Sequence, residues 1–322
     1  MYPESMFVSC DGAAGPHRVH VLKWPAKTKP SSLPPVICVH GLTRQGHDFF
    51  EIAQHLSQRR DVYSLTMAGR GESEWLKDPV HYIYPTYVAD CLFIIRETLK
   101  LTQVDWIGTS MGGLIGMWIA ALDSKRDASA PNGATGPAQN AIRSAPPSLE
   151  EGGATARAEE FHPALIRKLV LNDIGPFLPL TAVQRIAFYA GRVQNFNTME
   201  DVERYCRAIY ADFGIKSDKD WRFFAGHTVR KVEGGFTLHY DPSIAKNFGD
   251  VKEDVSVWPI YDAVACPTLL LRGVRSDVLS KAIAEQMTQQ GPKAKLVTFE
   301  NCGHAPALID AEQIKLVEEF LV

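Results

Sequence analysis

The segment Gly108-Thr109-Ser110-Met111-Gly112-Gly113 has the residue types and spacing of an activated serine. It follows a short apolar run, Val104–Ile107, and opens a stretch in which apolar residues recur with helical spacing. A tight turn between a strand and a helix holds its serine out from the backbone, and glycines two positions away let the strand and helix approach closely. Amide groups at the start of that helix can stabilise negative charge. We therefore predict that Ser110 is a nucleophile.

A serine hydroxyl attacks a carbonyl only when a histidine takes its proton and a carboxylate orients that histidine. The chain has ten histidines, and His304 is distinguished by its position after the last strand-like run, Lys295–Phe299. Polar loops that follow parallel strands gather at one edge of a sheet, so His304 and Ser110 can meet despite their separation in sequence. We predict that His304 is the base.

Two aspartates are candidates for the orienting carboxylate. Asp277 follows the apolar run Thr268–Leu271, and Asp173 follows the run Lys168–Leu171. Because both runs are predicted strands, either side chain can reach the edge at which Ser110 lies. Either aspartate gives the chain order nucleophile, acid, base. We assign the orienting role to Asp277 and keep Asp173 as the alternative acid, or as a turn or N-cap residue at the entry to the cap.

Backbone amides are needed to hold the oxyanion of an acyl-transfer reaction. The loop His40-Gly41-Leu42-Thr43-Arg44 follows another predicted buried strand, 35–39. An amide from such a loop meets the amide of the residue after the nucleophile, so we expect the N–H groups of Leu42 and Met111 to form the hole. We expect His40 to be structural, and Arg44 to contact a polar substrate group or solvent.

Strand-like and helix-like segments alternate over most of the chain. An alternating hairpin in residues 6–24 precedes six short apolar runs, and helical patterns separate most of those runs. This order predicts an α/β protein with a doubly wound, mostly parallel, eight-stranded sheet.

Two segments interrupt the alternation and define the predicted domains. Residues 124–160 are rich in Ala, Gly, Pro and Ser and predict a flexible surface insertion within a first core part, 1–176. Residues 177–257 show successive helical patterns rich in aromatic residues, which predict a helical cap before a second core part, 258–322. We expect Phe177, at the start of the cap, to line an apolar substrate pocket.

Composition excludes several classes of protein. The 322 residues carry 34 Lys and Arg against 37 Asp and Glu, a net charge of -3, with no basic run for nucleic acid. No apolar run has the length of a membrane span or a signal peptide, and the six cysteines are scattered without a metal-binding or disulfide pattern. We expect a cytoplasmic protein with no metal and no cofactor; the oligomeric state stays open.

The His40-Gly41 loop, Gly69-Arg70-Gly71-Glu72-Ser73, the Ser110 segment, the Asp277 loop and Gly303-His304 together resemble the α/β-hydrolase superfamily. The resemblance covers nearly the whole chain and is greatest to capped, cofactor-free serine esterases and haloperoxidase-like hydrolases. Many such proteins have an aspartate shortly before the Gly-Arg-Gly loop, where this chain has Thr66. The resemblance implies the α/β-hydrolase fold, a catalytic triad of Ser110, Asp277 and His304, and an oxyanion hole at Leu42 and Met111.

These expectations lead to one reaction class and two alternatives. The expected reaction is hydrolysis of a small to medium carboxylic ester by water through an acyl-enzyme. A carbon–carbon bond hydrolase or a lactonase would use the same residues. A ligand-binding protein derived from a hydrolase would keep the cavity without turnover.

Overall fold

The core of the protein is a mostly parallel sheet that brings the ends of distant strands to one edge. The computed structural model describes residues 2–28, 31, 33–124, 164–249 and 251–322. Eight strands are hydrogen-bonded in the order β1-β2-β4-β3-β5-β6-β12-β13, and β1 and β2 are antiparallel to their neighbours. This is the mostly parallel, eight-stranded sheet predicted from the alternation of strands and helices, and it is the α/β-hydrolase fold that the resemblance implies.

The strands of this sheet coincide with the predicted apolar runs to within a few residues. They are β1 (Glu4–Gly12), β2 (Gly15–Trp24), β3 (Val36–Val39), β4 (Val62–Thr66), β5 (Val104–Thr109), β6 (Ile166–Asn172), β12 (Thr268–Gly273) and β13 (Lys295–Phe299). The central strands β3, β4 and β12 are buried along their whole length, as expected for strands covered on both faces.

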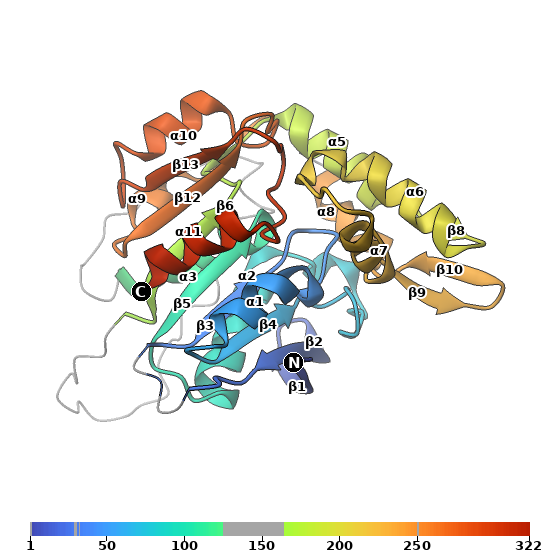
Figure 1. Ribbon diagram of the computed structural model, residues 1–322, viewed down its shortest axis with the longest axis horizontal. Helices are drawn as coiled ribbons and strands as arrows, with labels where there is room; N and C mark the ends of the chain where they lie inside the picture. Colours follow the sequence, from blue (N-terminus) through green and yellow to red (C-terminus); the bar gives the residue numbers. More distant parts are fainter. Residues whose placement is uncertain (1, 29–30, 32, 125–163, 250) are drawn as a thin grey trace.

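Helices cover both faces of the sheet (Figure 1). One face packs against α2 (Tyr84–Leu92), which continues as the π-helix η3 (Phe93–Thr98), and against α3 (Met111–Ser124), α9 (Trp258–Asp262) and α10 (Lys281–Met287). The other face packs against α1 (Phe50–Leu56), which follows the short helix η1 (Gly46–Phe49), and against α11 (Ala311–Leu321). A further short helix, η2 (Pro79–His81), precedes α2.

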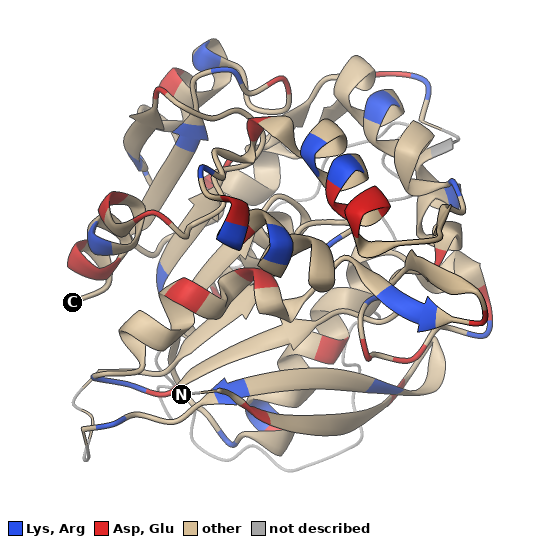
Figure 2. Ribbon diagram, turned by 45° about the vertical axis from the view of Figure 1, so that its right-hand side comes forward, with Lys and Arg blue, Asp and Glu red and all other residues tan. Residues whose placement is uncertain are grey.

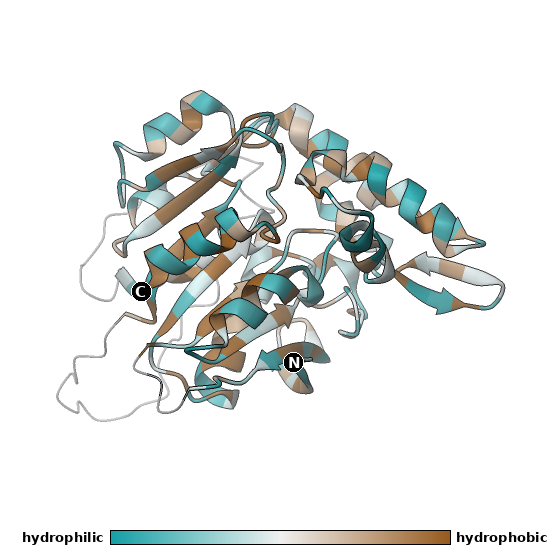
Figure 3. Ribbon diagram, in the orientation of Figure 1, coloured by the Kyte–Doolittle hydropathy of each residue, from teal (hydrophilic) through white to brown (hydrophobic). Residues whose placement is uncertain are grey.

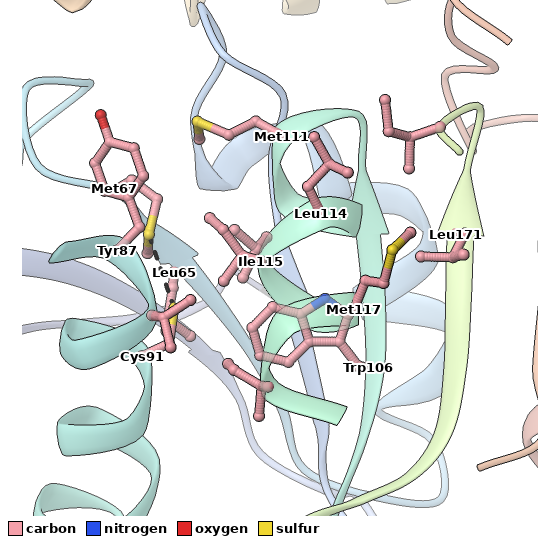
Figure 4. Close-up of a cluster of buried hydrophobic side chains, with 14 of the residues drawn as sticks. Leu65, Met67, Tyr87, Cys91, Trp106, Met111, Leu114, Ile115, Met117 and Leu171 are labelled. Atoms are coloured by element: carbon pink, nitrogen blue, oxygen red, sulfur yellow. Dashed lines mark hydrogen bonds between the residues drawn. The ribbon is translucent and has the colours of Figure 1, made fainter. Parts of the chain in front are cut away.

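Apolar side chains concentrate on the strands and on the inner sides of the helices, as Figure 3 shows by colour. Figure 4 shows the core below the site, where Trp106 of β5 lies against Met117 and Ile115 of α3. Trp106 also donates its indole N–H to the carbonyl of Gly112 at 3.0 Å. The large core side chain thereby fixes the first turn of the helix that follows Ser110.

Residues 177–257, called here the inserted segment, form a layer beside the carboxyl edge of the sheet (Figure 1). Its elements are β7 (Phe177–Leu178), α5 (Leu180–Ala190), β8 (Asn195–Phe196), α6 (Met199–Ile209), η5 (Ala211–Phe213), α7 (Asp218–Gly226), β9 (Val229–Val232), β10 (Gly235–Leu238), η6 (Pro242–Ala245), α8 (Lys246–Gly249) and β11 (Val255–Ser256). Aromatic residues of α6 and α7 pack into a hydrophobic cluster of their own.

The prediction for the inserted segment was right about its helices and wrong about one stretch. The succession of helical patterns expected over residues 177–257 is interrupted after α7, which ends at Gly226, because β9 pairs with β10 in a hairpin. Glu233 and Gly234 form its turn, and the φ angles of Gly234 (79°) and of Gly235 (156°), the first residue of β10, are ones at which a side chain would be strained. Hairpin turn chemistry therefore overrode the apolar periodicity.

Two further predictions concern surface and membrane. The insertion predicted over residues 124–160 lies outside the described residues except for Ser124, the last residue of α3. None of the described helices has the length and apolarity that crossing a membrane requires. Acidic and basic residues are interspersed over the ribbon in Figure 2, in keeping with a net charge of -3.

Candidate active site

Ser110 lies in the sharp turn between β5 and α3, as its sequence context predicts. Its φ of 51° is left-handed, a strained backbone conformation for a residue with a side chain. A Cβ at Gly112 would overlap the carbonyl oxygen of Val39, so only glycine permits this approach of α3 to β3. The Ser110 amide donates to the carbonyl of Asn172 at 3.0 Å, which ties the turn to β6.

His304 and Ser110 are in hydrogen-bonding distance, although 194 residues separate them in the chain. Nε2 of His304 lies 3.0 Å from Oγ of Ser110, and Nδ1 lies 2.8 Å from Oδ2 of Asp173. With the proton on Nδ1, the imidazole donates to the carboxylate and its Nε2 accepts from the serine hydroxyl. Ser110, His304 and Asp173 thus have the arrangement that acyl transfer requires of a nucleophile, a base and an orienting acid.

The environment of Asp173 suits a permanent negative charge. The residue is 0% exposed, and it follows directly after β6. Besides His304, its carboxylate accepts the amide N–H of Gly273 at 2.8 Å and the hydroxyl of Ser276. Both donors come from β12 and the loop after it, so two adjacent loops hold the carboxylate against the imidazole.

The preference for Asp277 as the orienting acid is corrected by this geometry. The carboxylate of Asp277 is 49% exposed and forms an ion pair with Arg185 of α5, with an N–O distance of 2.6 Å. The loop after β12 directs Ser276 inward, to Asp173, and Asp277 outward. The local polarity of the two sequences is a signal for which aspartate is buried. Apolar Leu171 and Ile174 flank the Asn172-Asp173 pair, whereas Arg275 precedes Ser276-Asp277.

The amides of Leu42 and Met111 lie in the same pocket as Ser110. Neither amide donates a hydrogen bond to any group in the described parts of the chain, so both are available to a ligand. The loop of Leu42 passes beside the nucleophile, since a Cβ at Gly41 would lie 3.6 Å from that of Ser110. The arrangement can present two N–H donors to an oxyanion.

His40 and Arg70 stabilise this loop from below. Nδ1 of His40 donates to the carbonyl of Gly41 at 2.7 Å, and Nε2 accepts the amide N–H of Met67 at 2.9 Å. Burial lowers the pKa of His40 to about 3, so the ring is neutral and structural, as expected. Arg70, which sequence reasoning did not single out as a site residue, donates to the carbonyl of Leu42 at 2.9 Å.

Asn172 is a second residue that the sequence analysis missed. Its side-chain amide donates to Oγ1 of Thr109 at 3.0 Å and to the carbonyl of Pro306 at 2.8 Å. These bonds connect the turn before Ser110 with the loop that carries His304. The position of Asn172 at the end of β6, next to Asp173, was the available signal.

Two pockets meet at Ser110. One, the apolar lobe, measures about 410 Å³ including its open mouth. Its walls are Leu42, Tyr84, Met111, Leu114, Ile174, Leu178, Val183, Ile186, Phe248 and Val278. Phe177, predicted to line the pocket, is instead paired with Ser256 in the small β7–β11 ladder, and its neighbour Leu178 takes the position in the wall.

The other pocket, the polar lobe, measures about 510 Å³ including its open mouth. It contains Ser110 and His304 together with Gly41, Leu42, Thr43, Arg44, Asp48, Thr109, Arg185, Ile186, Tyr189, Ile209, Tyr210, Phe213 and Ala305. Arg44 is 3% exposed, is bonded to Asp48 and Thr228, and stacks on Phe224. Its guanidinium therefore joins the core to the inserted segment, and its predicted role toward substrate is not supported by its contacts.

One group of side chains has the spacing of metal ligands. Among the described residues, ligand atoms of Cys10, His17 and Asp90 lie within 4.8 Å of one another. The three residues are buried between the β1–β2 hairpin and α2, and His17 already donates to Asp90 at 3.0 Å. They are not among the residues that form the two pockets at Ser110.

Comparison with known proteins agrees with this architecture. The family model of the alpha/beta hydrolase fold matches residues 34–130. The chain is 33% identical over 328 residues to a 3-hydroxybutyrate-oligomer hydrolase of Cupriavidus necator, covering 99% of this chain and 97% of the relative. It is 26% identical over 298 residues to a proline iminopeptidase of Lactobacillus helveticus, covering 90% of each.

A solved structure shows the same fold over the full length. The crystal structure of an alpha/beta hydrolase from Novosphingobium aromaticivorans superposes with a TM-score of 0.77 at 29% identity, covering 99% of this chain and 98% of that one. With its sheet order, its strained serine turn and its full-length hydrolase relatives, the chain belongs to the α/β-hydrolase family and is a hydrolytic enzyme.

Proposed function

We propose that the protein is a serine hydrolase that cleaves a carboxylic ester through an acyl-enzyme. The observation that carries the proposal is the continuous hydrogen-bonded series from Ser110 through His304 to Asp173, with distances of 3.0 and 2.8 Å. The fold does not require a strained serine beside a histidine that a buried carboxylate orients, whereas acyl transfer does. The two free amides at the same pocket complete the requirements of acyl transfer.

In the proposed reaction, Oγ of Ser110 forms a bond to the ester carbonyl carbon while its proton passes to Nε2 of His304. The negative charge on the carbonyl oxygen is stabilised by the amides of Leu42 and Met111. Collapse of the tetrahedral species breaks the bond to the alcohol oxygen, which receives the proton from His304. Water then repeats the sequence on the acyl-serine, and Asp173 stabilises the imidazolium in both halves.

The inserted segment supports the assignment of a small or medium substrate. It contributes Leu178, Val183 and Phe248 to the apolar lobe and Arg185 and Tyr189 to the polar lobe. We propose that this segment acts as the cap of the site and selects the substrate. The relative from Cupriavidus necator makes esters of 3-hydroxybutyrate the first compounds to assay.

The test is labelling with a fluorophosphonate, followed by peptide mapping and by kinetics on short-chain aryl esters and 3-hydroxybutyrate esters. We expect the label on Ser110 and complete loss of labelling and turnover in Ser110→Ala. Ser280→Ala, at the N-cap of α10 and outside both lobes, is the control and should keep both. A label on another residue, or turnover that survives Ser110→Ala, contradicts the proposal.

A further inference from the structure

The two lobes at Ser110 differ in chemistry, and the difference assigns the two halves of an ester. This argument rests on the proposed function. His304 must protonate the departing alcohol oxygen, so the alcohol half lies within reach of His304. His304 lines the polar lobe and is not part of the apolar lobe, whereas Ser110 lines both. The alcohol half therefore enters the polar lobe, and the acyl half enters the apolar lobe.

The polar lobe contains two arginines, and only one of them can bind a ligand. Arg44 donates to Asp48 through Nε and Nη2 and to Thr228 through Nη1, and it is buried. The side chain of Arg185 is 45% exposed, and it donates to Asp277 through Nε at 2.6 Å and Nη2 at 3.0 Å. Its Nη1 has no partner among the residues that the structure describes.

The ion pair with Asp277 fixes the orientation of Arg185 and leaves Nη1 available to a ligand. A bidentate carboxylate fixes the plane of the guanidinium, which is rigid and always charged. Because the pair is half-exposed, its own contribution to stability is small, and solvent screens the repulsion between Asp277 and a second carboxylate bound at Nη1. Thr43, Tyr189 and Tyr210 line the same lobe, and the hydroxyl groups of Thr43 and Tyr210 are hydrogen-bonded to each other at 3.2 Å.

We propose that the polar lobe is a carboxylate-binding subsite in which Arg185, positioned by Asp277, binds an acid group on the alcohol half of the ester. The substrate class is then the ester of a hydroxycarboxylic acid through its hydroxyl group. Cleavage releases the free hydroxy acid from the polar lobe. An acid group on the acyl half would face the apolar lobe and find no cation there.

The experiment compares single-ester substrates that differ in one charge. In the first pair, 3-acetoxybutyrate and its carboxamide, the acid has its charge on the alcohol half of the ester. In the second pair, monoethyl succinate and ethyl succinamate, the acid has its charge on the acyl half. We expect the wild-type enzyme to have a higher kcat/KM for the acid than for the carboxamide in the first pair only. Arg185→Gln should reduce that preference about tenfold or more, the effect of losing a hydrogen bond to a charged group.

Arg192→Gln is the matched control, because Arg192 follows the same helix and its guanidinium lies 3.7 Å from the ring centroid of Phe188, outside both lobes. It should leave both preferences unchanged. Equal loss on acid and carboxamide in Arg185→Gln, or an unchanged preference, overturns the subsite. Turnover of the carboxamide by the wild type, and its loss in Ser110→Ala, test the proposed function separately from the subsite. An enzyme that shows this Ser110-dependent turnover but no preference for the acid over the carboxamide refutes the subsite alone. No Ser110-dependent turnover of any of the four compounds refutes both.

Discussion

The loops after β6 and β12 present an aspartate at the same edge of the sheet, yet the two carboxylates have opposite environments. Asp173 is fully buried and accepts hydrogen bonds from His304, Gly273 and Ser276. Asp277 is half-exposed and pairs with an arginine of the inserted segment. A place after a parallel strand brings a side chain to the site, but burial and hydrogen-bond donors decide what it does there.

This contrast also shows why one loop depends on the other. The loop that was expected to supply the acid instead supplies the Ser276 hydroxyl as a donor to it, and the last residue of β12 supplies the Gly273 amide. An unpaired buried carboxylate would be costly, so Asp173 needs the loop after β12 to keep its charge. The two loops are therefore one functional unit.

The largest expected effect comes from exchanging each aspartate for asparagine. Asp173→Asn should lower kcat by about 10⁴-fold, as loss of the orienting aspartate does in serine proteases, because the imidazole loses its partner and correct tautomer. Asp277→Asn should lower turnover of a neutral ester by less than about tenfold, since an exposed ion pair contributes little. Steady-state kinetics on purified, folded variants decides it, and the reverse ranking would restore Asp277 as the acid.

A smaller effect is expected at Ser276. Ser276→Ala removes one donor to Asp173 and should lower kcat about tenfold, equivalent to about 1.4 kcal/mol in the barrier. Ser280→Ala is the control, because Ser280 caps α10 from the same loop and accepts the amide of Ile283. Urea unfolding should show that both variants lose stability, about 1 kcal/mol for the cap, while only Ser276→Ala loses activity. Equal kcat values for the two variants would argue that the loops are independent.

The smallest effect concerns stability in mild acid and extends the comparison to buried histidines. Burial lowers the pKa of His20, His40, His47, His227 and His239 below 6.5, and hydrogen bonding to Asp90 raises that of His17. Below pH 6.5 the five histidines with lowered pKa bind protons in the unfolded chain but stay neutral in the folded protein. The free energy of unfolding should therefore fall as pH falls. His17 acts in the opposite sense: it stabilises the folded protein below pH 6.5, and this stabilisation is lost as the pH rises through its raised pKa.

Urea titrations at pH 7, 6 and 5 measure this slope. His47, whose pKa is lowered to about 3, should contribute at most about 1.4 kcal/mol per pH unit, a limit approached only where the unfolded histidine is almost fully protonated, and less here because its ring is partly accessible. His47→Gln should therefore give a flatter slope than the wild type. A wild-type slope of zero or of opposite sign would contradict the burial argument.

Much of this architecture was predictable from local sequence. Ser110 and His304 were identified because each directly follows a predicted strand, and their meeting follows from parallel topology. The choice between Asp173 and Asp277 depends on which loop turns inward, and chain order alone does not encode that direction. The pocket residues Leu178 and Arg185 come from the inserted segment, whose packing on the core is a tertiary property without a fixed period or spacing.

The crowded turn around Ser110 has a consequence for anyone who wishes to redesign this enzyme. Positions 108, 112 and 113 have no free volume, so any side chain introduced there must displace neighbouring backbone or packed side chains. The residues of 177–257 that line the two lobes border open volume instead. New substrate ranges should therefore be sought by diversifying those residues while the turn is kept invariant.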